Sequence, residues 1–112
     1  MTREFIMTEF FDENWVKMGL DDEDMQHLQN YILHNPRIGV VVRGANGLRK
    51  LRWSMPNTGK RGGARVLYID FVSKDTVVLL NCYSKKEKDG ISLQEKDNYK
   101  KMIDILKKEL GV

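Results

Sequence analysis

Apolar residues recur every three or four positions in two segments near the N-terminus, which is the spacing of one face of an α-helix. The first predicted helix begins at Glu9, after a threonine that can cap it, and stops at Gly19. The second begins after Asp21 or Asp22 and ends at Asn35-Pro36, because a residue that precedes proline avoids helical geometry. The buried positions predicted for these helices are Phe11, Trp15, Met18, Met25, Leu28, Ile32 and Leu33.

The remaining apolar runs predict strands, followed by one more helix. Residues 3–7 fit an edge strand, and residues 38–42 fit either a short strand or a packed connection. Residues 48–55, 64–71 and 76–83 are predicted as three consecutive strands joined by turns or loops. A capping box at residues 92–95 starts the last helix, and Gly111 ends it. Its apolar stripe is Tyr99, Met102, Ile103, Leu106 and Leu110.

This order of elements predicts an α+β fold. Three consecutive strands with short connections favour an antiparallel sheet of three to four strands, with two N-terminal helices and one C-terminal helix. We expect the helices to cover one face of the sheet and to leave the other face, or one edge, for basic residues. The length of 112 residues predicts a single domain over residues 1–112.

Composition narrows the class of protein. The chain has no apolar run long enough to span a membrane, and its N-terminus lacks the features of a signal peptide, so we expect a cytoplasmic protein. The single cysteine, Cys82, excludes an internal disulfide and a cysteine-based zinc site, and it fits a small core residue. Nothing in the sequence indicates a cofactor.

Charge is distributed unevenly along the chain. Residues 1–24 carry a net charge of −6, whereas residues 37–69 contain eight basic residues and no acidic one. Clustered Lys and Arg side chains attract phosphates and release counterions when they bind nucleic acid. The alternative is a solvated basic surface without a ligand. Because the basic residues fall on predicted strands and loops, DNA recognition by a helix is disfavoured.

Three segments bring basic residues toward one predicted site. The loop Lys60-Arg61-Gly62-Gly63 combines two cations with two glycines, which allow a close approach of the backbone to a ligand. Arg65 follows at the start of a strand, and Arg49, Lys50 and Arg52 lie on the preceding strand. Antiparallel pairing also brings the end of the third strand close, with Tyr83, Lys85 and Lys86.

Such a site has the groups that RNA cleavage needs. The 2′-hydroxyl of RNA attacks the adjacent phosphate when a base takes its proton and cations stabilise the charge that develops. The basic region holds no acidic cluster, so two-metal chemistry is not expected there and no metal site is predicted. His27 and His34 lie together on the second predicted helix, away from the basic loop, and are expected to be exposed. Trp53 and Tyr68 can stack on bases or belong to the core.

Four stretches of the chain together resemble a known family. They are Asn35-Pro36, GLRKLR at residues 47–52, GKRGGARVLY at residues 59–68 and LNCYSKKE at residues 80–87. This combination resembles the HigB-type branch of the RelE-like toxins, which belong to type II toxin–antitoxin systems. The resemblance covers roughly residues 20–110.

The resemblance implies a ribosome-dependent mRNA interferase, an endoribonuclease that needs no metal and cuts mRNA in the ribosomal A site. It implies that Arg65 stabilises the phosphate charge and that Lys60 and Lys85 assist the reaction. The RNA-binding set comprises Arg49, Lys50, Arg52, Arg61 and Lys86. The family further implies a cognate antitoxin with a helix-turn-helix domain, and operator DNA bound only through the antitoxin complex.

The general base is left open by the sequence. RelE toxins often carry a tyrosine shortly after the basic pair that follows the last strand, and other HigB toxins use a histidine there. This chain has neither in residues 87–91, so Tyr83, Tyr68 or a lysine has to serve. An RNA- or ribosome-binding module that does not cleave, such as a degenerate toxin, is therefore the alternative function.

Overall fold

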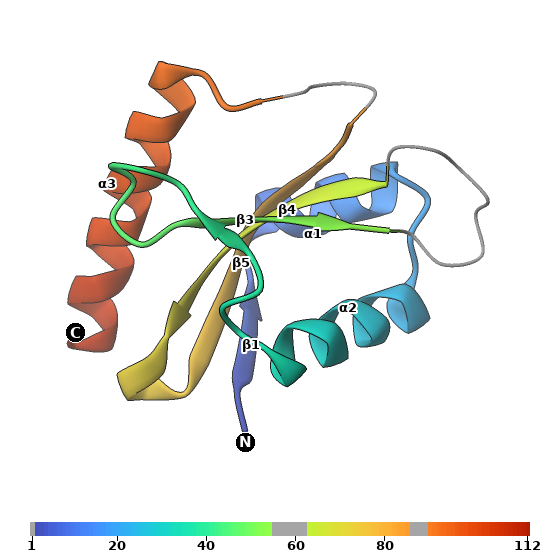
Figure 1. Cartoon of the computed structure of the whole chain (residues 1–112), viewed down its shortest axis with the longest axis horizontal. Coiled ribbons are helices and arrows are strands. Elements are labelled where there is room, and N and C mark those ends of the chain that lie inside the picture. Colours follow the sequence, from blue (N-terminus) through green and yellow to red (C-terminus); the bar gives the residue numbers. More distant parts are fainter. Residues whose placement is uncertain (1, 55–62, 86–89) are drawn as a thin grey trace.

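The computed structural model describes residues 2–54, 63–85 and 90–112, and it contains a mixed sheet flanked by helices (Figure 1). The strands lie in the order β1-β5-β4-β3-β2. The elements are β1 (Glu4–Met7), α1 (Glu9–Lys17), α2 (Asp22–His34), β2 (Val40–Val41), β3 (Arg49–Trp53), β4 (Ala64–Phe71), β5 (Thr76–Ser84) and α3 (Leu93–Leu110).

The α+β class and the three predicted helices are confirmed, and the sheet has five strands among the described residues. β3, β4 and β5 pair antiparallel in succession, as predicted, and β2 pairs antiparallel with β3. The N-terminal run is an edge strand, but it pairs parallel with β5, from Glu4 opposite Thr76 to Met7 opposite Leu79. Residues 38–42 contribute the two-residue strand β2 at the other edge.

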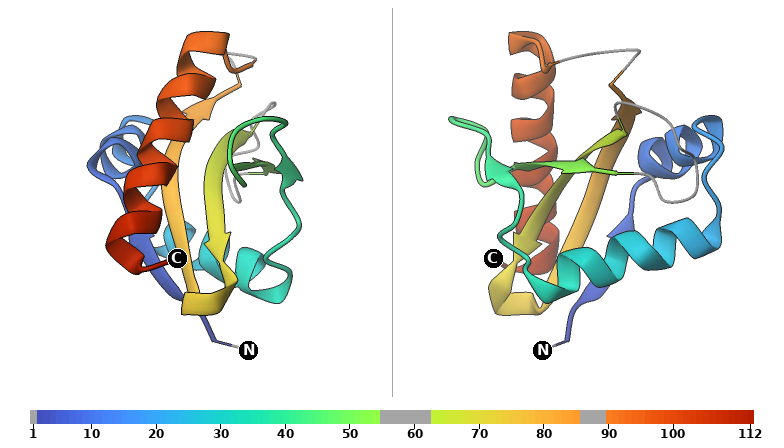
Figure 2. Two further views of the ribbon diagram at one scale, coloured as in Figure 1. Left: turned by 90° about the vertical axis from the view of Figure 1, so that its left-hand side faces the viewer. Right: turned by 45° about the vertical axis from the view of Figure 1, so that its right-hand side comes forward.

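Helices cover both faces of the sheet, so the expectation that they cover one face is wrong (Figure 2). Phe11, Trp15, Leu28 and Ile32 of α1 and α2 pack on one face, and α3 packs on the other. Nearly every residue of β4 and β5 is buried, since side chains that alternate between two covered faces all lose contact with water. The basic residues therefore lie at one end of the sheet, because both of its faces are covered by helices.

The helix boundaries follow the local signals in the sequence. The hydroxyl of Thr8 accepts a hydrogen bond from the backbone N–H of Phe11 at 3.1 Å and caps α1. Asp21 and Ser92 form capping boxes at the starts of α2 and α3. Gly111 ends α3 with a φ of +75°. Each of these bonds satisfies a backbone group that lacks a partner within the helix. The helix ends are therefore set by a few adjacent residues.

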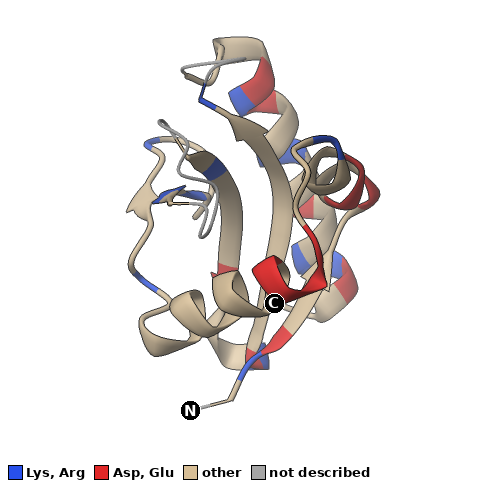
Figure 3. Ribbon diagram, turned by 90° about the vertical axis from the view of Figure 1, so that its right-hand side faces the viewer, with Lys and Arg blue, Asp and Glu red and all other residues tan. Residues whose placement is uncertain are grey.

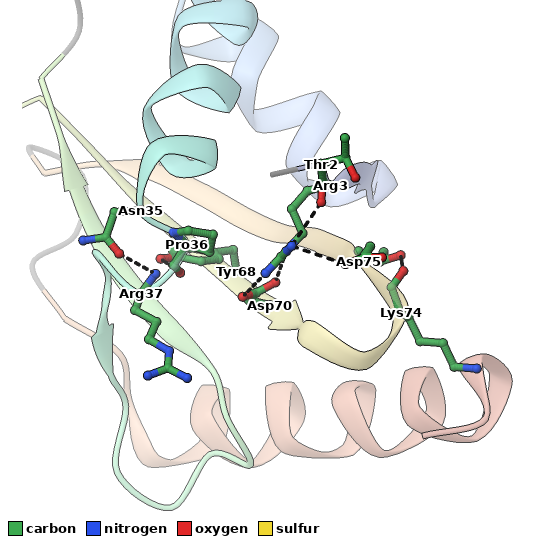
Figure 4. Close-up of polar contacts among 10 residues, drawn as sticks. Thr2, Arg3, Asn35, Pro36, Arg37, Tyr68, Asp70, Lys74 and Asp75 are labelled. Atoms are coloured by element: carbon green, nitrogen blue, oxygen red, sulfur yellow. Dashed lines mark hydrogen bonds and ion pairs between the residues drawn. The ribbon is translucent and has the colours of Figure 1, made fainter.

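An ion pair fixes β1 to the sheet (Figure 4). Nε of Arg3 lies 2.8 Å from Oδ1 of Asp70, and Nη1 lies 3.4 Å from Oδ1 of Asp75. The hydrogen bond to Asp70 is the main cause of a raised pKa of Arg3. Over the described ranges, none of the helices has the length and apolar character needed to cross a membrane.

Candidate nucleic-acid interface

A row of polar side chains crosses three strands at one end of the sheet. Arg52 of β3 lies opposite Arg65 of β4, which in turn lies opposite Tyr83 of β5. Residues directly opposite each other in antiparallel strands project from the same face, with Cβ atoms about 5 Å apart. The row is on the face that α3 covers further along, because Leu67, two residues after Arg65, belongs to the core under α3.

Arg65 is the buried charge of this row. Its exposed fraction is only 5%. Nη1 of its guanidinium is fully buried and has no hydrogen-bond partner among the residues that the structure describes. A buried charged donor without a partner is costly in free energy. Such a group is stabilised by an anion that accepts its hydrogen bonds, and a phosphate has the matching geometry.

Two lysines extend the positive charge around this row. Lys50 is half-buried and lies two residues before Arg52 on the same face of β3. Lys85 is exposed at the end of β5, and its backbone N–H donates to the carbonyl oxygen of Gly63 at 3.4 Å. This bond places the end of β5 beside the start of β4, as the antiparallel prediction required. Lys60, Arg61 and Lys86 lie outside the described residues.

The charges of the described residues are segregated in space as they are in sequence (Figure 3). Acidic residues gather on α1 and on the first turn of α2. Basic residues lie on β3 and at the start of β4. A polyanion is therefore favoured at the strand end and disfavoured over α1 and the start of α2.

The structure shows why position 63 requires a glycine, which the sequence did not reveal. Its φ is +53°, and a Cβ atom there would lie 2.5 Å from the carbonyl oxygen of Trp53. The glycine therefore permits close contact between the start of β4 and the end of β3. This contact holds Arg65 in register with Arg52, so Gly63 acts on the site through the backbone.

Arg49 does not join the row, although it was predicted to bind RNA. It lies opposite Tyr68, which belongs to the core under α1 and α2, and therefore on the other face from Arg65. Its Nη1 donates to the carbonyl oxygens of Gly39 at 2.7 Å and Arg37 at 3.2 Å. These bonds hold the side chain in place against the backbone on that face.

Tyr68 and Trp53 are core residues. The hydroxyl of Tyr68 donates to the carbonyl oxygen of Pro36 at 2.8 Å and accepts from the N–H of Gly39 at 2.9 Å. Burial raises the pKa of Tyr68, and the group is fully covered. Trp53 is 5% exposed and stacks on Trp15. Neither ring is accessible to stack on a base, and Tyr68 is removed from the candidates for the general base.

The other reactive side chains lie outside the row. Cys82 is fully buried, and burial raises the pKa of its thiol to about 12, which fits its predicted role as a small core residue. His27 and His34 are exposed on α2, as expected. Within the described ranges, no group of three or more His, Cys, Asp or Glu side chains is arranged to hold a metal ion.

A hollow of about 290 Å³ lies beside the row, at the position of Lys50, two residues before Arg52 on β3. It is lined by Val40, Val41, Val42, Lys50, Ile91, Leu93 and Lys96. Sequence reasoning did not single out Lys96, because a lysine in the first turns of a helix is usually solvated. The only available signal was its position four residues after the cap Ser92, on the side of α3 that faces the sheet.

Comparison with known proteins identifies the fold. No protein-family model matches the chain. The structure is similar to E. coli RelE in the intact RelBE toxin–antitoxin complex, with a TM-score of 0.55 and 20% identity over 74% of this chain and 96% of that chain. It is similar to the isolated E. coli RelE toxin, with the same TM-score and 18% identity over 90% and 99% of the two chains.

A free RelE variant with two arginines changed to alanine also has a TM-score of 0.55 to this chain, at 19% identity over 80% of this chain and 90% of that one. These three likenesses agree on the architecture. The chain therefore has the RelE-like toxin fold, and the fold class predicted from the sequence is confirmed.

Proposed function

We propose that this protein is the toxin of a type II toxin–antitoxin system and cleaves mRNA in the ribosomal A site. The RelE-like fold supports the toxin assignment. The single observation that carries the chemistry is the guanidinium of Arg65, which lies at a basic strand end and whose buried Nη1 has no hydrogen-bond partner among the described residues. The HigB-type assignment rests on the sequence motifs. The site of action is the cytoplasm, where ribosomes translate mRNA.

The proposed reaction is a transesterification within the RNA strand. The 2′-oxygen loses its proton and bonds to the adjacent phosphorus, and the bond from phosphorus to the 5′-oxygen breaks. The leaving 5′-oxygen takes up a proton, so the products are a 2′,3′-cyclic phosphate and a 5′-hydroxyl. Charge develops on the non-bridging oxygens, and a preorganised guanidinium stabilises it without reorganisation.

Each residue of the site has a proposed part in this reaction. Arg65 stabilises the phosphorane, and Arg52 and Lys50 hold the flanking phosphates from the same face of β3. Tyr83, directly opposite Arg65, and Lys85, beside the start of β4, are the proposed proton-transfer groups. Lys60, Arg61 and Lys86 remain proposed contributors from sequence alone. The cationic side chains supply the charge stabilisation, so we propose a reaction without a metal ion.

The proposed partners follow from the same assignment. A cognate antitoxin, with a helix-turn-helix domain, neutralises the toxin, and the complex of the two binds operator DNA. The RelBE complex supports a partner of this class, because it contains a protein of this fold bound to its antitoxin. The ribosome supplies the mRNA in an extended form, and the counterion effect makes binding sensitive to salt.

The test is primer extension on a reporter mRNA in a bacterial cell-free translation reaction, with and without ribosomes. We expect new ends that appear in phase with codons and require ribosomes. Arg65→Ala should lower the cleavage rate about a hundredfold or more, the scale for loss of one preorganised donor to a developing charge. Arg65→Lys should keep part of the activity, since it keeps the charge and loses the planar fork.

Arg37→Ala is the matched control, because Arg37 belongs to the same basic segment and its side chain is exposed (Figure 4). A thermal melt of each variant separates lost chemistry from lost folding. Cleavage by Arg65→Ala at the wild-type rate would contradict the proposal. Ribosome binding without new ends would favour the non-cleaving RNA-binding module, an alternative that gains weight because Tyr68 is sealed in the core.

A further inference from the structure

The hollow beside β2 combines an apolar lining with two cations. Val42 and Ile91 are half-buried in it, and Leu93 is 84% exposed at its rim. Lys50 and Lys96 line it from β3 and α3, and neither makes a hydrogen bond or an ion pair with any residue that the structure describes. By contrast, Lys101 and Lys107 of the same helix bind Asp97 and Asn46.

Lys96 reaches across the hollow to the turn that precedes β3. A Cβ atom at Gly44 would lie 3.4 Å from Nζ of Lys96, so the ammonium group sits close to the backbone of this turn. The φ of Gly44 is +73°, which favours glycine. Lys96 is half-buried as a residue, and its ammonium group lies against one wall, with Lys50 on another. Two ammonium groups in one hollow, without a partner in the described part of the chain, favour an anionic ligand.

The hollow is in register with the row Arg52–Arg65–Tyr83. Lys50 and Arg52 are two residues apart on the same face of β3, which corresponds to about 7 Å along the strand. This is the scale of one nucleotide step in an extended RNA strand. A volume of about 290 Å³ lies at the lower end of small-ligand sites, so it suits one nucleotide better than a long peptide.

We infer that this hollow binds the nucleotide next to the scissile phosphate, with its phosphate on Lys50 and Lys96 and its base against Val42, Ile91 and Leu93. The inference rests on the proposed function and extends it to a residue, Lys96, that the sequence motifs do not include. The apolar wall contacts the face of a base. It therefore contributes to affinity and to the choice of base at that position.

The test measures binding and cleavage separately. The full-length protein is titrated into a fluorescein-labelled single-stranded RNA heptanucleotide at several salt concentrations, and fluorescence anisotropy gives Kd. The same preparations are used for primer extension on programmed ribosomes, with reporters that differ in one base beside the cut. Inorganic polyphosphate, which lacks bases, competes in a parallel titration.

Lys96→Ala should weaken RNA binding about five- to tenfold and lower the salt slope of log Kd by about 0.7, the contribution of one phosphate contact on a single strand. Leu93→Ala should weaken RNA binding, leave polyphosphate competition unchanged and alter the base preference beside the cut. Lys101→Ala is the control, since Lys101 lies five residues further on α3, turned about 140° around the helix. A merely structural role for Lys96 would not change the salt slope.

The outcomes separate this inference from the proposed function. In one outcome the wild type cleaves mRNA, and Lys96→Ala and Lys101→Ala have the same RNA affinity and the same cleavage rate. This outcome would overturn the nucleotide site and leave the toxin assignment intact. Weaker RNA binding by Lys96→Ala in a protein that never cuts would support the site and refute the cleavage.

Discussion

Replacing Tyr68 by phenylalanine removes one oxygen atom from the core and leaves the ring in place. That oxygen bonds the carbonyl of Pro36 at 2.8 Å and the N–H of Gly39 at 2.9 Å, and Tyr68 itself is fully buried. Without the hydroxyl, two buried backbone groups lose a partner. Each such group costs about 1–3 kcal/mol, so we expect Tyr68→Phe to lower the free energy of unfolding by about 2–6 kcal/mol.

This loss is large enough to measure as a shift in Tm. For a chain of this size 1 kcal/mol corresponds to about 4 °C, so Tm should fall by about 8–24 °C in a thermal melt followed by circular dichroism. Tyr31→Phe is the matched control, because Tyr31 is 44% exposed on α2. We expect that change to leave Tm within about 2 °C.

The same variant tests the assignment of the general base. At a temperature where Tyr68→Phe is fully folded, its cleavage rate should equal that of the wild type, since the hydroxyl faces the connection between α2 and β2. An unchanged Tm would refute the energetic argument. A normal Tm together with a large loss of cleavage would place Tyr68 in the reaction and refute its structural assignment.

Two further predictions concern the frame of the site. Gly63→Ala should destabilise the protein by more than about 2 kcal/mol in urea unfolding. The reason is that the added Cβ meets the carbonyl oxygen of Trp53 at 2.5 Å and that the φ of Gly63 is positive. An unaltered urea midpoint would show that the two strands can move apart without a cost in free energy. Cys82 titrates near pH 9 when unfolded and near 12 when folded, so the stabilisation from its protonated thiol is complete below pH 9 and is lost between pH 9 and 12. Over that range, the free energy of unfolding of the wild type should therefore fall by up to about 1.4 kcal/mol per pH unit more than that of Cys82→Ala. Equal falls in the two proteins would contradict the assigned pKa.

The end of each helix was predictable because it depends on a few neighbouring residues. Thr8, Asp21 and Ser92 cap helices with bonds that span three positions, and Gly111 takes a backbone conformation that glycine readily adopts. The pairing of β3, β4 and β5 was also predictable, since short connections leave antiparallel neighbours few alternatives. This pairing sufficed to bring Arg52, Arg65 and Tyr83 into one predicted site.

Properties that depend on contacts distant in sequence were not predictable. The parallel pairing of β1 with β5 joins segments about 70 residues apart, and nothing local indicates its direction. The position of α3 on the opposite face from α1 and α2 depends on the face to which the chain crosses after β5. The near-continuous apolar runs of β4 and β5 indicated only that both faces of these strands are covered, because a strand buried on both faces need not alternate. They did not indicate which helix covers which face.

The sequence by itself determined the elements, their order and the cations that gather at one strand end, because periodicity, capping and charge are local properties. Only the tertiary structure decided which cations face which way. It directed Arg49 to backbone carbonyls on one face and left Arg65 buried on the other, with a donor that no described residue accepts. The difference arises because the face of a side chain is fixed by strand register, and its partners come from distant parts of the chain.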